Sequence, residues 1–242
     1  MKRNYNYMLF APLKRALRDF KMINEDDLIG VGVSGGKDSI VLLYALDLLR
    51  KISKIKFRIK AISLDLGWDA DYSELTDFCD KNEISLDIVP TNIAKVVFDE
   101  RKESNPCSLC AKMRRGALNS YAKSIGCDKV ALGHHQDDAA ETFLLSLLYE
   151  GRINCFSPLS YLDRTDITII RPLIYVTEKN IRKIREELSL PLIVNNCPAN
   201  GKTKREEMKR MIANLKTSNP LALQRIAGAI DKSIWKKDIN SN

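Results

Sequence analysis

Six residues near the N-terminus have the types and spacing of a site that binds phosphate. The string Ser34-Gly35-Gly36-Lys37-Asp38-Ser39 brings two glycines, two hydroxyl side chains and a lysine together. Glycine lets the backbone approach an anion closely. Free N–H groups at the start of a helix point at such an anion, and the helix dipole assists them. We therefore expect this string, with Val33 before it, to hold the phosphates of a nucleotide.

Two common phosphate-binding motifs do not describe the string. A Walker P-loop would need a glycine at position 31, where Val31 stands. The pattern Gly-x-Gly-x-x-Gly is present, but Gly30 and Gly32 fall inside a predicted strand instead of after it. The string instead resembles the PP-loop of the ATP pyrophosphatase superfamily. Those enzymes split ATP between its α and β phosphates and leave an adenylated substrate.

A second polar group follows the short apolar run at 130–132. It contains Gly133, His134, His135, Asp137 and Asp138, and its histidines are the two that the chain has. Adjacent carboxylates can hold Mg²⁺, which prefers oxygen ligands, whereas an Asp at a helix start can also serve as a simple cap. We expect Asp38, with Asp137 or Asp138, to organise Mg²⁺, and Gly133 and His134 to lie against the nucleotide.

The cysteines divide into two groups. Cys107 and Cys110 have metal or redox spacing, and the chain has no second such pair to complete a four-cysteine zinc site. Cys197 precedes a proline in a polar, turn-rich segment, where a core cysteine is not expected. Three converging thiolates would leave one iron of an iron–sulfur cluster open to a ligand such as sulfide. Core positions are favoured for the other three, Cys79, Cys127 and Cys155.

The positive charge of the chain is uneven. The net charge of +8 lies within residues 151–242, which have 17 Lys and Arg against 9 Asp and Glu; residues 1–150 have 22 of each. A one-sided basic surface suits RNA, although a solvated helical face would have the same composition. The candidate RNA contacts are Arg114, Arg115, Arg171, Lys202, Lys204 and Arg205.

The elements that must position these residues alternate along the chain. Apolar runs at 28–33, 57–64, 84–89, 130–132 and 167–170 predict strands, and amphipathic or capped stretches predict helices at 8–22, 40–49, 73–82, 93–101, 107–126, 138–149, 178–188, 203–216 and 221–236. The order favours an α/β fold with a doubly wound parallel sheet. Ligands of such sheets lie beyond the carboxyl ends of the strands, which places Asp65 near the nucleotide.

We divide the chain into a packing helix at 1–27, an ATP-binding α/β domain at 28–175 and a basic helical part at 176–242. The composition, 45% hydrophobic and 29% charged, is that of a globular protein. No apolar run reaches the ~18 residues of a membrane span, and the N-terminus lacks the apolar core of a secretory signal. We therefore expect no membrane association, a cytoplasmic location and cysteines that are not paired in disulfides.

Taken together, several motifs resemble the tRNA 2-thiocytidine synthetase family. The resemblance runs from about residue 13 to 215 and rests on five segments: 13–23, 33–39, 107–116, 132–138 and 171–173. It implies an adenine-nucleotide α-hydrolase-like sheet with a C-terminal helical extension, and a 4Fe-4S cluster on Cys107, Cys110 and Cys197. The implied reaction is ATP-dependent insertion of sulfur at C2 of a cytidine in the tRNA anticodon loop.

In this interpretation the base oxygen attacks the α-phosphate of ATP, and sulfur then replaces the adenylated oxygen. The residues with catalytic roles are Lys37, Asp38, Asp137, Cys107 and Cys197. The expected partners are tRNA, a sulfur donor such as a cysteine desulfurase or free sulfide, an electron donor and, as a candidate, a second copy of the chain. Three alternatives stay open: another PP-loop tRNA enzyme of 2-thiouridine or lysidine type, a PP-loop synthetase acting on a small molecule, and a non-catalytic iron–sulfur sensor that binds nucleic acid.

Overall fold

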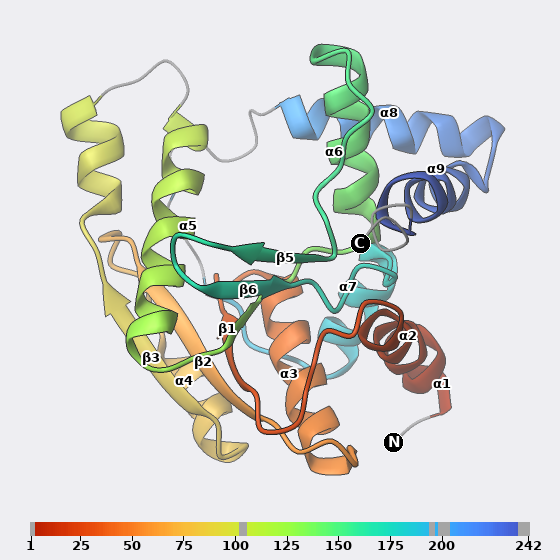
Figure 1. Cartoon of the computed structure of the whole chain (residues 1–242). Coiled ribbons are helices and arrows are strands. Elements are labelled where there is room, and N and C mark those ends of the chain that lie inside the picture. The colour runs from red at the N-terminus through yellow and green to blue at the C-terminus, as the bar shows by residue number, and fades with distance from the viewer. Residues whose placement is uncertain (1–2, 102–105, 194–196, 198–203, 237–242) are drawn as a thin grey trace.

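A computed structural model describes residues 3–101, 106–193, 197 and 204–236 (Figure 1). Its centre is a six-stranded sheet in the order β3-β2-β1-β4-β6-β5. Every pairing is parallel except that of β5 with β6. The strands are β1 Leu28–Gly32, β2 Arg58–Asp65, β3 Ser85–Pro90, β4 Lys129–Ala131, β5 Leu159–Leu162 and β6 Ile167–Ile170. The predicted α/β fold with a parallel-dominated sheet is confirmed.

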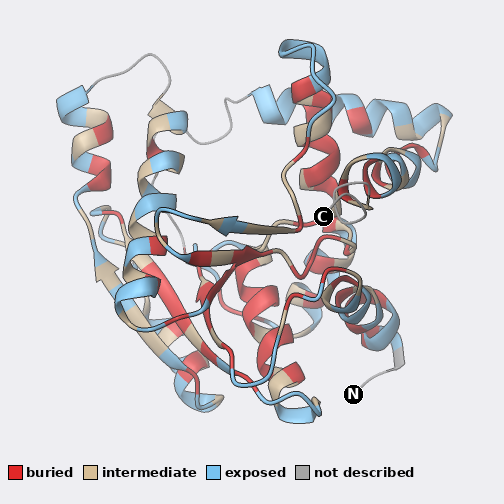
Figure 2. Cartoon of the chain, in the orientation of Figure 1, coloured by how far each residue is buried: buried red, intermediate tan, exposed pale blue. Residues whose placement is uncertain are grey.

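The sheet is covered on both faces, as a doubly wound fold requires. Helices α3 (Lys37–Ile52) and α4 (Ser73–Lys81) pack on one face, and α5 (Pro106–Ser124) packs on the other. Helix α3 is apolar almost all round, because it lies between the sheet and α7 (Glu178–Glu187). Its burial is visible in Figure 2. The main core therefore holds the start of α3 in a fixed position relative to β1.

The N-terminal segment belongs to this core. It consists of α1 (Arg3–Tyr5), a π-helical turn η1 (Asn6–Phe10) and α2 (Ala11–Asp19), which follow one another without a break. Pro12 lies in the first turn of α2, and the helix predicted at 8–22 ends at Asp19. Proline suits the first turn of a helix, where its missing N–H is not needed. Leu9, Phe10 and Leu13 are fully buried against the main core.

The C-terminal part completes the structure beside α6 (Gln136–Tyr149). Helices α8 (Lys204–Ser218) and α9 (Ala222–Ile230) pack with α6 around a small apolar cluster. A π-helical turn η3 (Asp231–Trp235) follows α9, and another, η2 (Lys95–Arg101), precedes the segment that leads to α5. None of the helices in these described ranges has the length and hydropathy needed to span a bilayer.

A buried ion pair connects the starts of two neighbouring strands. Lys129 Nζ lies 2.6 Å from Asp27 Oδ2, and both residues are buried. The same Asp27 oxygen accepts a hydrogen bond from the Asn24 backbone N–H at 2.6 Å. This pair fixes β4 against β1, and the carboxyl ends of those two strands form the site described next.

Candidate functional site

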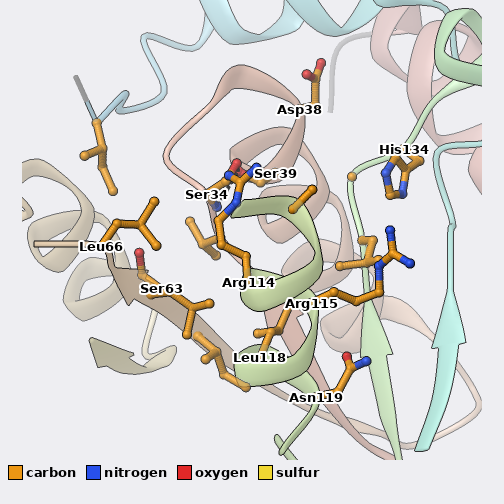
Figure 3. A pocket seen from close by; sticks show the side chains of 18 of the residues that line it. Ser34, Asp38, Ser39, Ser63, Leu66, Arg114, Arg115, Leu118, Asn119 and His134 are labelled. Atoms are coloured by element: carbon orange, nitrogen blue, oxygen red, sulfur yellow. Dashed lines mark hydrogen bonds between the residues drawn. The ribbon is translucent and has the colours of Figure 1, made fainter. Parts of the chain in front are cut away.

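A cavity of about 350 Å³ opens beyond the carboxyl ends of β1, β2 and β4, beside α5 (Figure 3). Its wall includes residues from the predicted phosphate string, from the end of β2, from the Gly133–Asp138 group and from one side of α5. Asp65 is not in this wall, although its neighbours Leu64 and Leu66 are. The Asp65 carboxylate instead accepts the Gly67 N–H at 3.0 Å. The sheet thus brings together most of the residues predicted for the nucleotide.

The phosphate string forms a tight, internally bonded turn. Ser39 Oγ accepts the Ser34 N–H at 3.2 Å and donates to the Gly36 carbonyl at 2.9 Å. Gly35 has φ +79°, and a Cβ atom there would overlap the side chain of Ile193. The Ile193 N–H donates to the Gly35 carbonyl at 3.0 Å. The chain segment that leads toward Cys197 is therefore fastened to the turn that is predicted to hold phosphate.

Gly133 lies directly against the same turn. A Cβ atom at this position would stand 3.0 Å from the Asp38 carbonyl carbon, 3.0 Å from Ser39 N and 3.1 Å from Asp38 O. All three atoms belong to the backbone, so they cannot move aside as a flexible side chain would. Glycine is needed here because the end of β4 and the start of α3 approach each other so closely.

Two carboxylates face each other across His135. The His135 Nε2 atom lies 3.5 Å from Asp38 Oδ1 and 3.4 Å from Asp138 Oδ2. His135 is buried and caps α6, and Asp138 completes a capping box by accepting the His135 N–H at 3.0 Å. Asp38 Oδ1 is buried and has no hydrogen-bond partner among the described residues. Because Asp38 and Asp138 both line the cavity, they suit a hard cation such as Mg²⁺.

Asp137 has a different environment from Asp138. Its Oδ2 accepts the Glu178 N–H at 2.7 Å, and it is absent from the cavity wall although the residue is buried. Its carboxylate therefore joins the start of α7 to α6. Of the two aspartates predicted for Mg²⁺, Asp138 lines the cavity and Asp137 does not.

His134 is held neutral by its surroundings. Burial, with the nearby charge of Arg171, lowers the pKa of His134 to about 4. The Arg171 Nε–H donates to His134 Nδ1 at 3.3 Å, so the ring proton lies on Nε2 at neutral pH. His134 can therefore donate a hydrogen bond into the cavity that it lines.

Arg171 lies inside the structure, where the sequence predicted an RNA contact. Besides His134, its guanidinium donates to the Ser157 carbonyl at 2.6 Å and stacks 5.0 Å from the Phe156 ring centroid. Burial lowers its pKa to about 10. Its donors are thus used within the protein, and we assign it to the orientation of His134.

Lys37 does not extend freely toward the cavity. Its Nζ lies 3.1 Å from Asp38 Oδ2 and 3.1 Å from Glu178 Oε1. Sequence reasoning assigned no role to Glu178, because nothing in its local sequence separates it from other glutamates at helix starts.

Three of the six cysteines share one neighbourhood. All six are free. Burial raises the pKa of the Cys110 thiol, the nearby Arg114 guanidinium opposes this rise, and the charges of Cys197 and Cys107 add to it. Cys110 therefore lies within electrostatic range of both predicted co-ligands. Among the described residues, no three His, Cys, Asp or Glu side chains are arranged closely enough to enclose a metal ion.

The other three cysteines are core residues, as predicted. Cys79, Cys127 and Cys155 are buried, and burial raises the pKa of Cys155 to about 12. Such thiols do not supply thiolate ligands at neutral pH. Cys110 is also buried, but the Arg114 guanidinium beside it opposes the rise in its pKa. The group of Cys107, Cys110 and Cys197 therefore fits a thiolate-bound cofactor better than the three core cysteines do.

The predicted RNA-contact residues fall in three places. Arg114 and Arg115 are exposed on α5 and line the cavity. Figure 3 shows Arg114 extending toward Ser34 and Ser39, and Arg115 extending toward His134.

The candidates on α8 lie beside α6. Arg205 is exposed, and its guanidinium lies 3.4 Å from the Glu141 carboxylate and 3.7 Å from the Asp138 carboxylate. Lys204 stands 4.2 Å from the Tyr149 ring centroid. Lys202 lies outside the described residues.

Comparisons with known proteins agree with this geometry. The family model of the PP-loop domain matches residues 9–215. A tRNA-cytidine(32) 2-sulfurtransferase of Pelobacter propionicus is 38% identical over 85% of the chain and 78% of the relative. The protein of that name from Coxiella burnetii is 38% identical over 90% of the chain and 86% of the relative.

A solved structure resembles the chain over most of its length. It is the U34-tRNA thiolase NcsA from Methanococcus maripaludis with its 4Fe-4S cluster, which superposes with a TM-score of 0.76 at 25% sequence identity. The match covers 92% of this chain and 78% of the thiolase.

Proposed function

The chain belongs to the tRNA-cytidine(32) 2-sulfurtransferase family, and from this premise we propose that it uses ATP to replace the C2 oxygen of a tRNA cytidine with sulfur. One observation carries the proposal: residues near the three cysteines also line or contact the nucleotide cavity. The Arg114 guanidinium opposes the rise in the pKa of Cys110, and Arg114 also lines the cavity. Ile193, four residues before Cys197, bonds to the phosphate turn. Activation by ATP and delivery of sulfur are thus brought to one place.

In this proposal the residues Ser34–Ser39 bind the phosphates of ATP. Backbone N–H groups at the start of α3 and the Ser34 hydroxyl would face the anion, and Ser39 would hold the turn in shape through its bonds with Ser34 and Gly36. Asp38 and Asp138 would hold Mg²⁺, which neutralises phosphate charge as pyrophosphate leaves. His134 is neutral and donates from Nε2, so it can bind a phosphate oxygen or the reacting carbonyl without adding charge.

The thiols of Cys107, Cys110 and Cys197 would hold a 4Fe-4S cluster. Such a cluster supplies an iron that three protein ligands leave open to sulfide. Arg114, beside Cys110, favours the thiolate that cluster binding requires. The base oxygen would bond to the α-phosphate as pyrophosphate leaves, and sulfide would then displace AMP, which takes the former base oxygen with it.

The tRNA would approach over the exposed arginines of α5 and the basic start of α8. Arg114, Arg115 and Arg205 are exposed at the rim of this region and suit phosphate contacts. A sulfur donor, either a cysteine desulfurase or free sulfide, an electron donor and a second copy of the chain remain proposed partners. The tRNA pool that such an enzyme serves is cytoplasmic, in keeping with the location expected from the sequence.

The test is iron and sulfide analysis of protein purified and reconstituted without oxygen. We expect about four irons and four sulfides per wild-type chain, a marked loss in Cys197→Ala and Cys107→Ala, and wild-type content in the control Cys155→Ala. AMP formation from ATP in the presence of tRNA is measured on the same samples. Equal iron content in wild type and Cys197→Ala would contradict the three-cysteine site. Full modification activity in Cys107→Ala would favour a lysidine-type reaction, which needs no thiols.

A further inference from the structure

Glu178 forms ion pairs with three cations that come from three different elements. Its Oε1 lies 3.1 Å from Lys37 Nζ on α3, 2.9 Å from Lys209 Nζ on α8 and 3.3 Å from Arg182 Nη2 on its own helix. The Glu178 side chain is only 11% exposed. A carboxylate with three cationic neighbours keeps two of them if one departs.

The position of Glu178 is fixed through its own backbone. It is the first residue of α7, where Thr177 caps the helix. Its N–H donates to Asp137 Oδ2 at 2.7 Å, and Asp137 lies in the first turn of α6, one residue from Asp138. The backbone of Glu178 is therefore fixed to α6, and its carboxylate keeps Lys209 and Arg182 as partners if Lys37 swings toward a phosphate.

Lys37 must exchange partners when it binds ATP. Its Nζ lies 3.1 Å from Asp38 Oδ2 and 3.1 Å from Glu178 Oε1. A phosphate that binds this ammonium group therefore competes directly with these two carboxylates.

We propose that Glu178 is a positioning residue that holds Lys37 until ATP arrives, and that Lys209 of α8 sets how firmly it does so. This inference rests on the proposed function, since it takes ATP to be the ligand of the phosphate turn, Ser34–Ser39. It follows that α8, the helix beyond Cys197, is coupled to nucleotide affinity without contacting the nucleotide. Lys209 competes with Lys37 for one carboxylate oxygen, so removing Lys209 strengthens the pair between Lys37 and Glu178.

The test is calorimetric titration of the full chain with Mg-ATP in the absence of tRNA. Glu178→Gln removes the competing carboxylate, and we expect the Kd for ATP to fall about fivefold, the effect of one partly buried ion pair. Lys209→Met is expected to raise that Kd by a similar factor. A purely structural role would weaken ATP binding in both variants. Glu186→Gln, at an exposed position of the same helix, is the control for a lost surface charge.

Two further variants separate the possible failures. In the double variant Glu178→Gln/Lys209→Met, the Kd should equal that of Glu178→Gln alone, because Lys209 acts only through Glu178. An additional loss there would mean that Lys209 binds phosphate itself, and it would overturn the inference. Lys37→Met should weaken ATP binding at least tenfold. If Lys37→Met binds ATP like the wild type, the assignment of the phosphate turn as the ATP site in the proposed function fails. If only Lys37→Met has an effect, the proposed function stands and the role of Glu178 is refuted.

Discussion

Gly133→Ala tests whether the end of β4 and the phosphate turn form one rigid unit. The added methyl group would stand 3.0–3.1 Å from three backbone atoms of Asp38 and Ser39, inside the 3.4 Å at which ordinary contact begins. The turn or the strand end must therefore shift by a few tenths of an ångström. Overpacking of this kind costs about 1–3 kcal/mol.

This cost can lower the stability of the free protein or its affinity for ATP. If the free protein relaxes by moving the two segments apart, the melting temperature falls by about 2–4 °C for each kcal/mol. If the strain is felt only when the turn closes on ATP, the Kd for ATP rises by about 5- to 150-fold. The stability loss and the binding loss together should amount to about 1–3 kcal/mol.

The assay combines differential scanning calorimetry with ATP titration. Gly228→Ala is the control, since a Cβ atom there meets nothing within 4 Å and the residue lies inside α9. Alanine should stabilise that helix by up to about 1 kcal/mol and leave ATP binding unchanged. A Gly133→Ala protein with wild-type stability and wild-type ATP affinity would refute the close approach described here.

Two further predictions concern stability. Burial, with the charge of Asp138, raises the pKa of Glu141 to about 7, so its contribution to folding falls as the pH rises from about 4.5 to 7. Glu141→Gln should therefore gain about 3 kcal/mol relative to wild type between pH 4.5 and pH 8, and a constant difference in urea unfolding at both pH values would contradict this. Lys129→Met leaves the buried Asp27 without its cation and should lower the free energy of unfolding by about 3–5 kcal/mol; a loss below about 1 kcal/mol would show that the pair is not buried.

The parallel strands and the phosphate turn were predictable because each depends on local sequence. Continuous apolar runs mark strands that are buried on both faces, and Gly35 of the turn is required by its φ of +79°. The edge strand β5 was missed, since its residues are half-exposed and no buried face gives it a pattern. The helix predicted at 8–22 ends at Asp19, just before the chain turns at Lys21 with φ +48°.

The roles of individual side chains were less accessible to sequence reasoning. Asp137 and Asp138 are neighbours in sequence, but successive residues of a helix point about 100° apart, so one faces the cavity and the other faces α7. Arg171 reads as a surface cation until the fold places Ser157 and His134 around it. Glu178 gains its importance from Lys37 and Lys209, both distant in sequence. These assignments depend on tertiary contacts that no local pattern encodes.

The most direct test of the central claim is nucleoside analysis after reaction. The anaerobically reconstituted protein is incubated with unmodified tRNA, Mg-ATP, sulfide and a reductant, and the digested tRNA is examined by mass spectrometry. We expect 2-thiocytidine to form only when ATP is present, and to be absent with Lys37→Met and with Cys197→Ala. Formation of 2-thiouridine or lysidine instead, or of 2-thiocytidine without ATP, would contradict the proposed reaction.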